Sequence, residues 1–241
     1  MKKLQEEKME YLVSGQRYIG ILLKASIEEP KAAVVLLPDW RGQSKLAYEH
    51  ANHLIDLGYT VVIADLYGDG FTPNSPTEVG PLVKQLIEQR VESVQILVAC
   101  TKQLKTIISS NTPIFHLGFS AGGMIALDYG RMGADSDGII LCSALLKTAL
   151  PKMNQHIHAP ILILQGTQDE VSPMHTILEI IEEMDKVEND TNIHLYSQTH
   201  HAFDNPEAGT DPKARLVYSK KSAQRAKNDI ENFINNSLPK A

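Results

Sequence analysis

Cysteine is scarce in this chain, which has only Cys100 and Cys142 among its 241 residues. The two lie far apart in the sequence and form no Cys-x-x-Cys pair, so neither a disulfide scaffold nor a zinc knuckle is indicated. We expect both to be reduced thiols buried in the protein.

Long apolar segments are also missing. No apolar run approaches the ~18 residues that a membrane-spanning helix needs. The opening stretch MKKLQEEKMEYL is charged and has no apolar centre of the kind found in signal peptides. These features predict a cytoplasmic protein with no membrane partner.

Basic residues are outnumbered by acidic ones. The chain has 23 Lys and Arg against 29 Asp and Glu, which gives a formal net charge of −6. Proteins that bind nucleic acid present a basic surface to its phosphates. Nucleic acid is therefore not an expected partner. The charge does not indicate an oligomeric state.

What the chain does have is a series of short apolar runs rich in Val, Ile and Leu. Such runs are typical of parallel strands whose two faces are both covered by helices. An antiparallel hairpin within residues 10–26 is expected to precede them. The predicted strands are 32–37, 59–66, 113–118, 138–144 and 159–166, with a further one just before residue 200.

Helical patterns alternate with these strands, at 45–58, 91–109, 121–133, 173–187 and 218–237. The alternation predicts one doubly wound α/β domain spanning residues 1–241, with helices on both faces of a mostly parallel sheet. The connection between 138–144 and 159–165 is too short for a large lid. The segment 70–80 is rich in Pro, Ser and Thr and is expected to border the site as a loop.

The stretch FHLGFSAGGM, residues 115–124, places Ser120 between Gly118 and Gly122 where a strand gives way to a helix. Gly-x-Ser-x-Gly can arise by chance, so its setting matters. On a tight strand-to-helix turn the glycines give clearance, and the serine hydroxyl projects at the carboxyl edge of the sheet. The backbone N–H of Ala121 then points toward developing negative charge. The motif predicts a nucleophilic serine.

A serine hydroxyl needs a base to take its proton and an acid to orient that base. In α/β hydrolases these follow in the order Ser, acid, His. Asp169 follows the strand 159–166, with Glu170 as its neighbouring competitor. His200 and His201 follow the next strand and are the candidate bases.

Five stretches of the chain carry a family pattern: LLPDWRG (36–42), ADLYGDG (64–70), GFSAGG (118–123), GTQDEVSP (166–173) and HHAFDNPEAG (200–209). With them the chain resembles the dienelactone hydrolase family over nearly its whole length. The resemblance implies the α/β-hydrolase fold. It selects His201, which begins a His-x-Phe pattern, as the base, and Asp169 as the acid. It also implies the backbone N–H of Trp40 as a second oxyanion donor.

The chain departs from the founding members of this family at three positions. They carry a cysteine where Ser120 stands, a glutamate where Asp39 stands, and a substrate-binding arginine where Asn205 stands. Arg41 and Phe203 complete the candidate pocket residues. Without the arginine, we expect small neutral esters to be cleaved in preference to esters that carry a carboxylate.

The sequence thus predicts a serine hydrolase of small carboxylic esters or lactones, with no cofactor or metal. A thioesterase or transacylase could use the same triad, and a hydrolase fold kept as a small-molecule binding protein is a further alternative. His50 and His53 stand at helical spacing and could share a metal, but no carboxylate or third histidine is placed to complete the site. A solvated helix face is predicted for them.

Overall fold

The Val-, Ile- and Leu-rich runs form the middle of an eight-stranded sheet in the computed structural model, which describes residues 5–24, 29–150, 153 and 157–239. The strand order is β1-β2-β4-β3-β5-β6-β7-β8. Strands β1 and β2 pair antiparallel, β2 pairs antiparallel with β4, and the others run parallel. The strands are β1 (Gln5–Val13), β2 (Gln16–Lys24), β3 (Ala33–Leu37), β4 (Thr60–Ile63), β5 (Ile114–Phe119), β6 (Gly138–Cys142), β7 (Ile161–Gly166) and β8 (Thr191–Tyr196).

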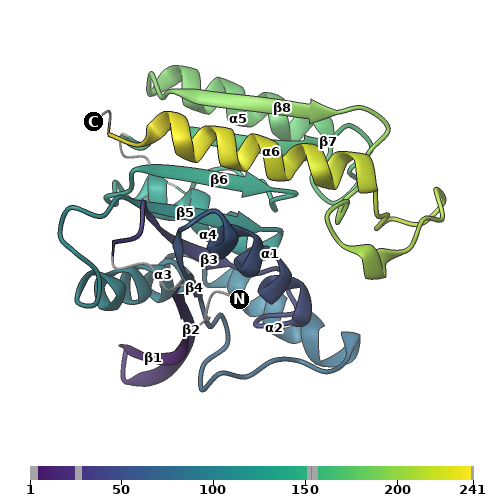
Figure 1. Ribbon diagram of the computed structural model, residues 1–241. Helices are drawn as coiled ribbons and strands as arrows, with labels where there is room; N and C mark the ends of the chain where they lie inside the picture. The colour runs from purple at the N-terminus through teal and green to yellow at the C-terminus, as the bar shows by residue number, and fades with distance from the viewer. Residues whose placement is uncertain (1–4, 25–28, 151–152, 154–156, 240–241) are drawn as a thin grey trace.

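Helices cover both faces of the sheet (Figure 1). On β3, Val34 and Leu36 pack toward one face while Val35 and Leu37 pack toward the other, as the period of a strand requires. The face of Val34 holds α1 (Lys45–Asp56) and α6 (Lys220–Ser237), and the opposite face holds α3 (Arg90–Lys105), α4 (Ala121–Arg131) and α5 (Met174–Lys186). The doubly wound fold is confirmed.

The predicted hairpin is confirmed as β1 and β2. Its two-residue turn is formed by Ser14 and Gly15, with φ of 49° and 85°. Positive φ at both positions is what a tight hairpin turn demands, and glycine meets that demand without strain.

The segment 70–80 differs from its predicted loop, because α2 (Pro76–Glu88) begins inside it. Ser75 caps the helix by accepting a hydrogen bond from the Glu78 N–H, and Glu78 Oε2 accepts one from the Asn74 N–H at 2.8 Å. This reciprocal capping satisfies N–H groups that the first turn leaves without partners. A helix, rather than a loop, therefore borders the site.

The parallel strands β3, β5, β7 and β8 end at the same edge of the sheet, so the segments that follow them meet there. Figure 1 shows α2 and the long segment after β8 at this end. Among the described helices, none has the length and apolarity needed to cross a bilayer.

Candidate active site

Ser120 stands on a strained turn between β5 and α4. Its φ of 48° and ψ of −113° lie where residues with a Cβ are rare. Two backbone hydrogen bonds hold it there: its N–H donates to Cys142 O at 3.2 Å, and its carbonyl accepts from Leu145 N at 2.9 Å. The end of β6 and the segment after it therefore fix the serine's position.

The two glycines of the motif allow the turn to pack tightly. A Cβ on Gly118 would lie 2.5 Å from the Cα of Gly123. A Cβ on Gly122 would collide with the carbonyl oxygens of Leu37 and Pro38, at the end of β3. Close approach at Gly122 thus brings the loop after β3 beside Ser120.

Ser120, His201 and Asp169 form a continuous hydrogen-bonded chain. Ser120 Oγ lies 3.0 Å from His201 Nε2, and His201 Nδ1 lies 2.7 Å from Asp169 Oδ2. Because a carboxylate only accepts hydrogen bonds, Nδ1 carries the ring proton and Nε2 is left to accept from the serine hydroxyl. All three residues are buried. The structure brings together Asp169 and His201, whereas Glu170 is exposed.

Asp169 is held by more than the histidine. Its Oδ1 accepts from the backbone N–H groups of Val171 and Ser172, both at 2.8 Å, and its Oδ2 also accepts from Gln165 Nε2 at 2.5 Å. The side chain has no solvent exposure. These donors fix the direction of the carboxylate. Sequence reasoning missed Gln165, which lies at the buried end of β7 and matches no motif.

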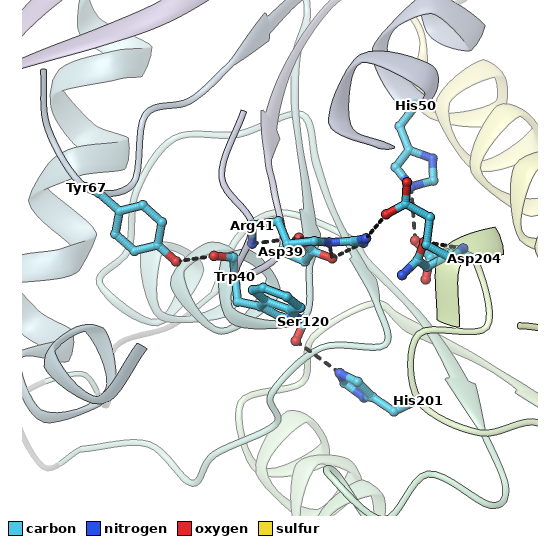
Figure 2. A network of polar contacts seen from close by, with 10 residues as sticks. Asp39, Trp40, Arg41, His50, Tyr67, Ser120, His201 and Asp204 are labelled. Carbon is cyan, nitrogen blue, oxygen red and sulfur yellow. Dashed lines mark hydrogen bonds and ion pairs between the residues drawn. The ribbon is translucent and has the colours of Figure 1, made fainter. Parts of the chain in front are cut away.

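The loop after β3 brings Trp40 to the other side of Ser120, as Figure 2 shows. The carbonyl oxygen of Trp40 accepts a hydrogen bond from the Tyr67 hydroxyl at 2.7 Å. Ala121 is the first residue of α4, where a helix leaves its N–H groups without intrahelical acceptors. Both candidate oxyanion donors therefore border the serine. No sequence signal indicated the contact of Tyr67.

Asp39 and Arg41 are paired with each other. The guanidinium of Arg41 donates from Nη2 at 2.6 Å and from Nε at 3.1 Å to Asp39 Oδ2, and Nη1 reaches Glu207 at 3.3 Å. Burial alone would lower the pKa of Arg41, but the bonds to Asp39 together with the charges of Asp39, Asp204 and Glu207 outweigh it, and the pKa rises. The charge of Arg41 is thus already neutralised by Asp39.

Phe203 and Asn205 do not line the pocket, which corrects the sequence interpretation. Phe203 has no exposed surface and packs edge-on against Tyr196, with ring centroids 5.3 Å apart. Asn205 accepts a hydrogen bond from the Glu207 N–H at 3.0 Å and caps η2 (Pro206–Ala208). The loop after His201 turns both side chains into the protein, where Phe203 packs in the core and Asn205 caps η2.

His50 is also placed differently from its predicted solvated face. Its Nε2 lies 3.0 Å from Asp204 Oδ2, and its ring stacks on Phe119 with centroids 4.2 Å apart. Burial alone would raise the pKa of Asp204, but the hydrogen bond and charge of His50 outweigh it and lower that pKa. Across the described residues there is no group of three or more side chains suited to bind a metal.

An open pocket of about 350 Å³ lies against Ser120 and His201. Apart from those two side chains its walls are almost wholly apolar, and α2 contributes one side. The lining residues are Trp40, Val79, Gly80, Val83, Ser120, Ala121, Leu145, Val171, His201 and Leu216. Asp39 and Arg41, like Phe203 and Asn205, lie outside this set.

Comparison with known proteins places the chain in a family. Residues 20–238 match the dienelactone hydrolase family. A relative from Aquifex aeolicus (strain VF5), named putative carboxymethylenebutenolidase, is 25% identical over 233 residues, covering 91% of this chain and 95% of that protein.

Two solved structures share the fold at a TM-score of 0.91, and each covers 98% of this chain and 99% of its own. One, named m3DLH, is 24% identical. The other, a dienelactone hydrolase-like promiscuous phosphotriesterase from metagenomic libraries, is 21% identical. With a family match over most of its length, the chain belongs to the dienelactone hydrolase family and is a carboxylic ester hydrolase.

Proposed function

We propose that the protein hydrolyses small carboxylic esters or lactones with Ser120 as the nucleophile, through an acyl-enzyme intermediate. The hydrogen-bonded chain from Ser120 through His201 to Asp169, built on a strained turn, is the observation that carries the proposal. The same constellation of roles serves nucleophilic acyl transfer on unrelated folds.

In the first half of the reaction, Ser120 Oγ attacks the ester carbonyl carbon while His201 Nε2 takes the hydroxyl proton. The carbonyl oxygen becomes an anion between the N–H groups of Ala121 and Trp40. Removing one such donor costs about 10²–10³-fold in kcat in a studied hydrolase. Asp169 keeps the imidazole in the tautomer that can accept the proton, and it stabilises the imidazolium that forms.

The acyl-enzyme forms when His201 gives its proton to the leaving alcohol oxygen and the bond from carbon to that oxygen breaks. Water then enters, His201 takes one of its protons, and the hydroxide attacks the acyl-enzyme carbonyl. Collapse of the second tetrahedral intermediate releases the carboxylic acid and returns the proton to Ser120. Atoms balance as one ester plus one water to one acid plus one alcohol.

Covalent labelling tests the nucleophile directly. A fluorophosphonate should modify Ser120, as mapped by mass spectrometry of the digested protein, because the activated serine oxygen attacks phosphorus and expels fluoride as it would attack an ester carbonyl and expel the alcohol. Ser120→Ala should lose the label and on the order of 10⁶-fold of kcat on a short nitrophenyl ester. Ser110→Ala, at an exposed position, is the matched control and should label normally.

Two results would overturn the assignment. One is a label on another residue of the wild-type protein. The other is retention by Ser120→Ala of more than about a tenth of kcat under conditions where acylation limits the rate. Dialysis against a chelator should leave turnover unchanged, since the proposed steps use side chains and backbone alone.

We further propose that residues 1–241 form one domain and that the protein works in the cytoplasm. One sheet contains strands from Gln5 to Tyr196, which supports the first point. Cys100 and Cys142 are free and buried, and burial raises the pKa of Cys100 to about 12, so these thiols suit a reducing compartment.

A further inference from the structure

The pocket beside Ser120 is lined mainly by apolar side chains. Val79 and Val83 of α2 form one side, and Leu145, Val171 and Leu216 form much of the rest. None of the described lining residues is Asp, Glu, Lys or Arg. A volume of about 350 Å³ is at the small end of the range for ligand sites. Such a pocket suits an uncharged chain of modest length.

Arg41 is the cation nearest in sequence to the pocket residue Trp40, and it is not available to a substrate. Asp39 accepts from it at 2.6 and 3.1 Å, Glu207 accepts from it at 3.3 Å, and only 12% of its side chain is exposed. A carboxylate entering the pocket would lose its hydration without gaining a partner, which is strongly unfavourable. The charge arrangement therefore discriminates against anionic esters.

Gly80 leaves one part of the pocket open. It lies on α2 between Val79 and Val83, and about 60° around the helix axis from Val83. A Cβ built at this position meets no atom within 4 Å. Glycine is less favourable than alanine inside a helix, so the helix itself gains nothing from it. What the glycine provides is space at the exposed side of the pocket.

We propose that the substrate is an uncharged carboxylic ester whose unbranched apolar chain lies along α2, against Val79 and Val83, and leaves the pocket past Gly80. Gly80 is then a specificity-determining residue, because any side chain there would narrow the exit. This inference rests on the proposed serine hydrolase function, and it adds the substrate class and the residue that limits chain length.

The test is a chain-length profile of kcat/KM measured by titration of the released acid. One series is ethyl alkanoates from acetate to octanoate, and the other is alkyl acetates from ethyl to octyl. In one of the two, kcat/KM should rise by about fourfold per added methylene until the chain reaches the exit. A matched ester with a terminal carboxylate should be at least about tenfold poorer than its uncharged counterpart of equal length.

Gly80→Phe should lower the ratio of kcat/KM for the longest to the shortest ester by at least about tenfold, because the ring covers the exit. Gly80→Ala, a smaller change that favours the helix, should lower it less. Glu88→Phe places the same ring at an exposed position two turns further along α2 and outside the pocket, and it should leave the ratio unchanged. Thermal unfolding of each variant verifies that it is folded.

Flat profiles in both series, or an equal ratio in wild type and Gly80→Phe, would overturn the inference. So would a wild-type preference for the anionic ester. If instead Ser120 takes no label from a fluorophosphonate, the proposed function fails first, whatever the profiles show. The two failures are therefore distinguishable.

Discussion

The hydroxyl of Tyr67 donates a 2.7 Å hydrogen bond to the carbonyl oxygen of Trp40, on the loop that borders Ser120. Burial and the nearby charge of Asp39 raise the pKa of Tyr67, so the hydroxyl stays protonated and continues to donate. This bond orients the residue whose N–H we assign to the oxyanion. Tyr67 is thus a positioning residue.

We expect Tyr67→Phe to lower kcat by about two- to tenfold while KM stays nearly constant, since the lost bond supports a charge present only in the transition state. Steady-state kinetics on a short uncharged ester measure this split. Tyr48→Phe, which removes an exposed hydroxyl bond to Glu6, is the control and should be unaffected. A rise in KM alone would show that Tyr67 only shapes the pocket.

Asp204 and His50 join the loop of His201 to the strand of Ser120, because His50 also stacks on Phe119. Asp204→Asn should reduce the free energy of unfolding at pH 7 by about 1–3 kcal/mol. The pKa of Asp204 is lowered in the folded protein, so its contribution is present above about pH 4 and is lost as the pH falls through the lowered value.

Denaturant unfolding at pH 7 and at pH 3 measures this effect, and the gap between wild type and Asp204→Asn should narrow at the lower pH. Asp211→Asn changes an exposed carboxylate of the same loop and provides the comparison. If the difference in unfolding free energy between wild type and Asp204→Asn were the same at both pH values, the charged pair would be excluded as the cause of that difference.

A buried charge network joins three helices on the face of the sheet opposite α1. Asp128 of α4 has no exposed surface and accepts from Arg90 of α3 at 2.7 Å and from Arg131 at 2.8 Å. Arg131 also reaches Glu183 of α5 at 2.6 Å. Asp128→Asn should cost about 3–5 kcal/mol of unfolding free energy, because it leaves buried cations short of a counter-charge.

Urea titration at pH 7 checks this cost. Asp135→Asn removes a pair with Lys105 in which the carboxylate is 90% exposed, and it should change stability little. At temperatures where Asp128→Asn remains folded, its kcat should match wild type, since the network lies away from Ser120. Equal costs for the two variants would contradict the buried-charge explanation.

We expect the buried His116, inside β5, to make the free energy of unfolding fall as the pH is lowered. Burial, with a smaller effect of the Lys105 charge, lowers the pKa of His116 to about 3. In the unfolded chain the imidazole of His116 binds a proton below about pH 6.5, whereas in the folded protein it stays neutral at that pH. Between pH 7 and pH 5 this histidine alone should therefore reduce the unfolding free energy by about 2 kcal/mol.

His116→Gln removes the titrating group while keeping polar atoms for Thr101 and Ser136, which contact the ring at 3.0 and 2.7 Å. Its unfolding free energy should fall less between pH 7 and pH 5 than that of wild type. Identical pH slopes for the two proteins would mean that His116 is not the source of the acid sensitivity.

The features that could be predicted from the sequence are those that depend on neighbouring residues. Gly118, Ser120 and Gly122 were recognisable because a strained turn constrains its own neighbours, and the doubly wound fold followed from alternating apolar patterns. The helix α2 was missed because Gly80 and Pro81 obscured a capping signal formed by Ser75 and Glu78.

The remaining differences depend on contacts between distant segments. Asn205 was assigned to the pocket because it stands where the founding members of the family have a substrate-binding arginine, and Phe203 because it belongs to the His-x-Phe pattern. The loop after His201 turns both side chains away from the pocket. The hydrogen bond from Tyr67 to Trp40 joins residues 27 positions apart, and no helix or strand pattern in the sequence predicts it. Likewise, Gln165 matters only because the turn after β7 returns Asp169 to it.

The proposed reacting groups follow the ends of β5, β7 and β8, and Ser120 and His201 are separated by 81 positions. The shortest segment of chain that contains them all runs from β5 to the loop after β8 and includes four neighbouring strands of the sheet. Recovery of activity during refolding therefore requires β7 and β8 to have docked beside β5 and β6. Circular dichroism reports helices whether or not these strands have docked, so enzymatic activity is the stricter measure of complete folding.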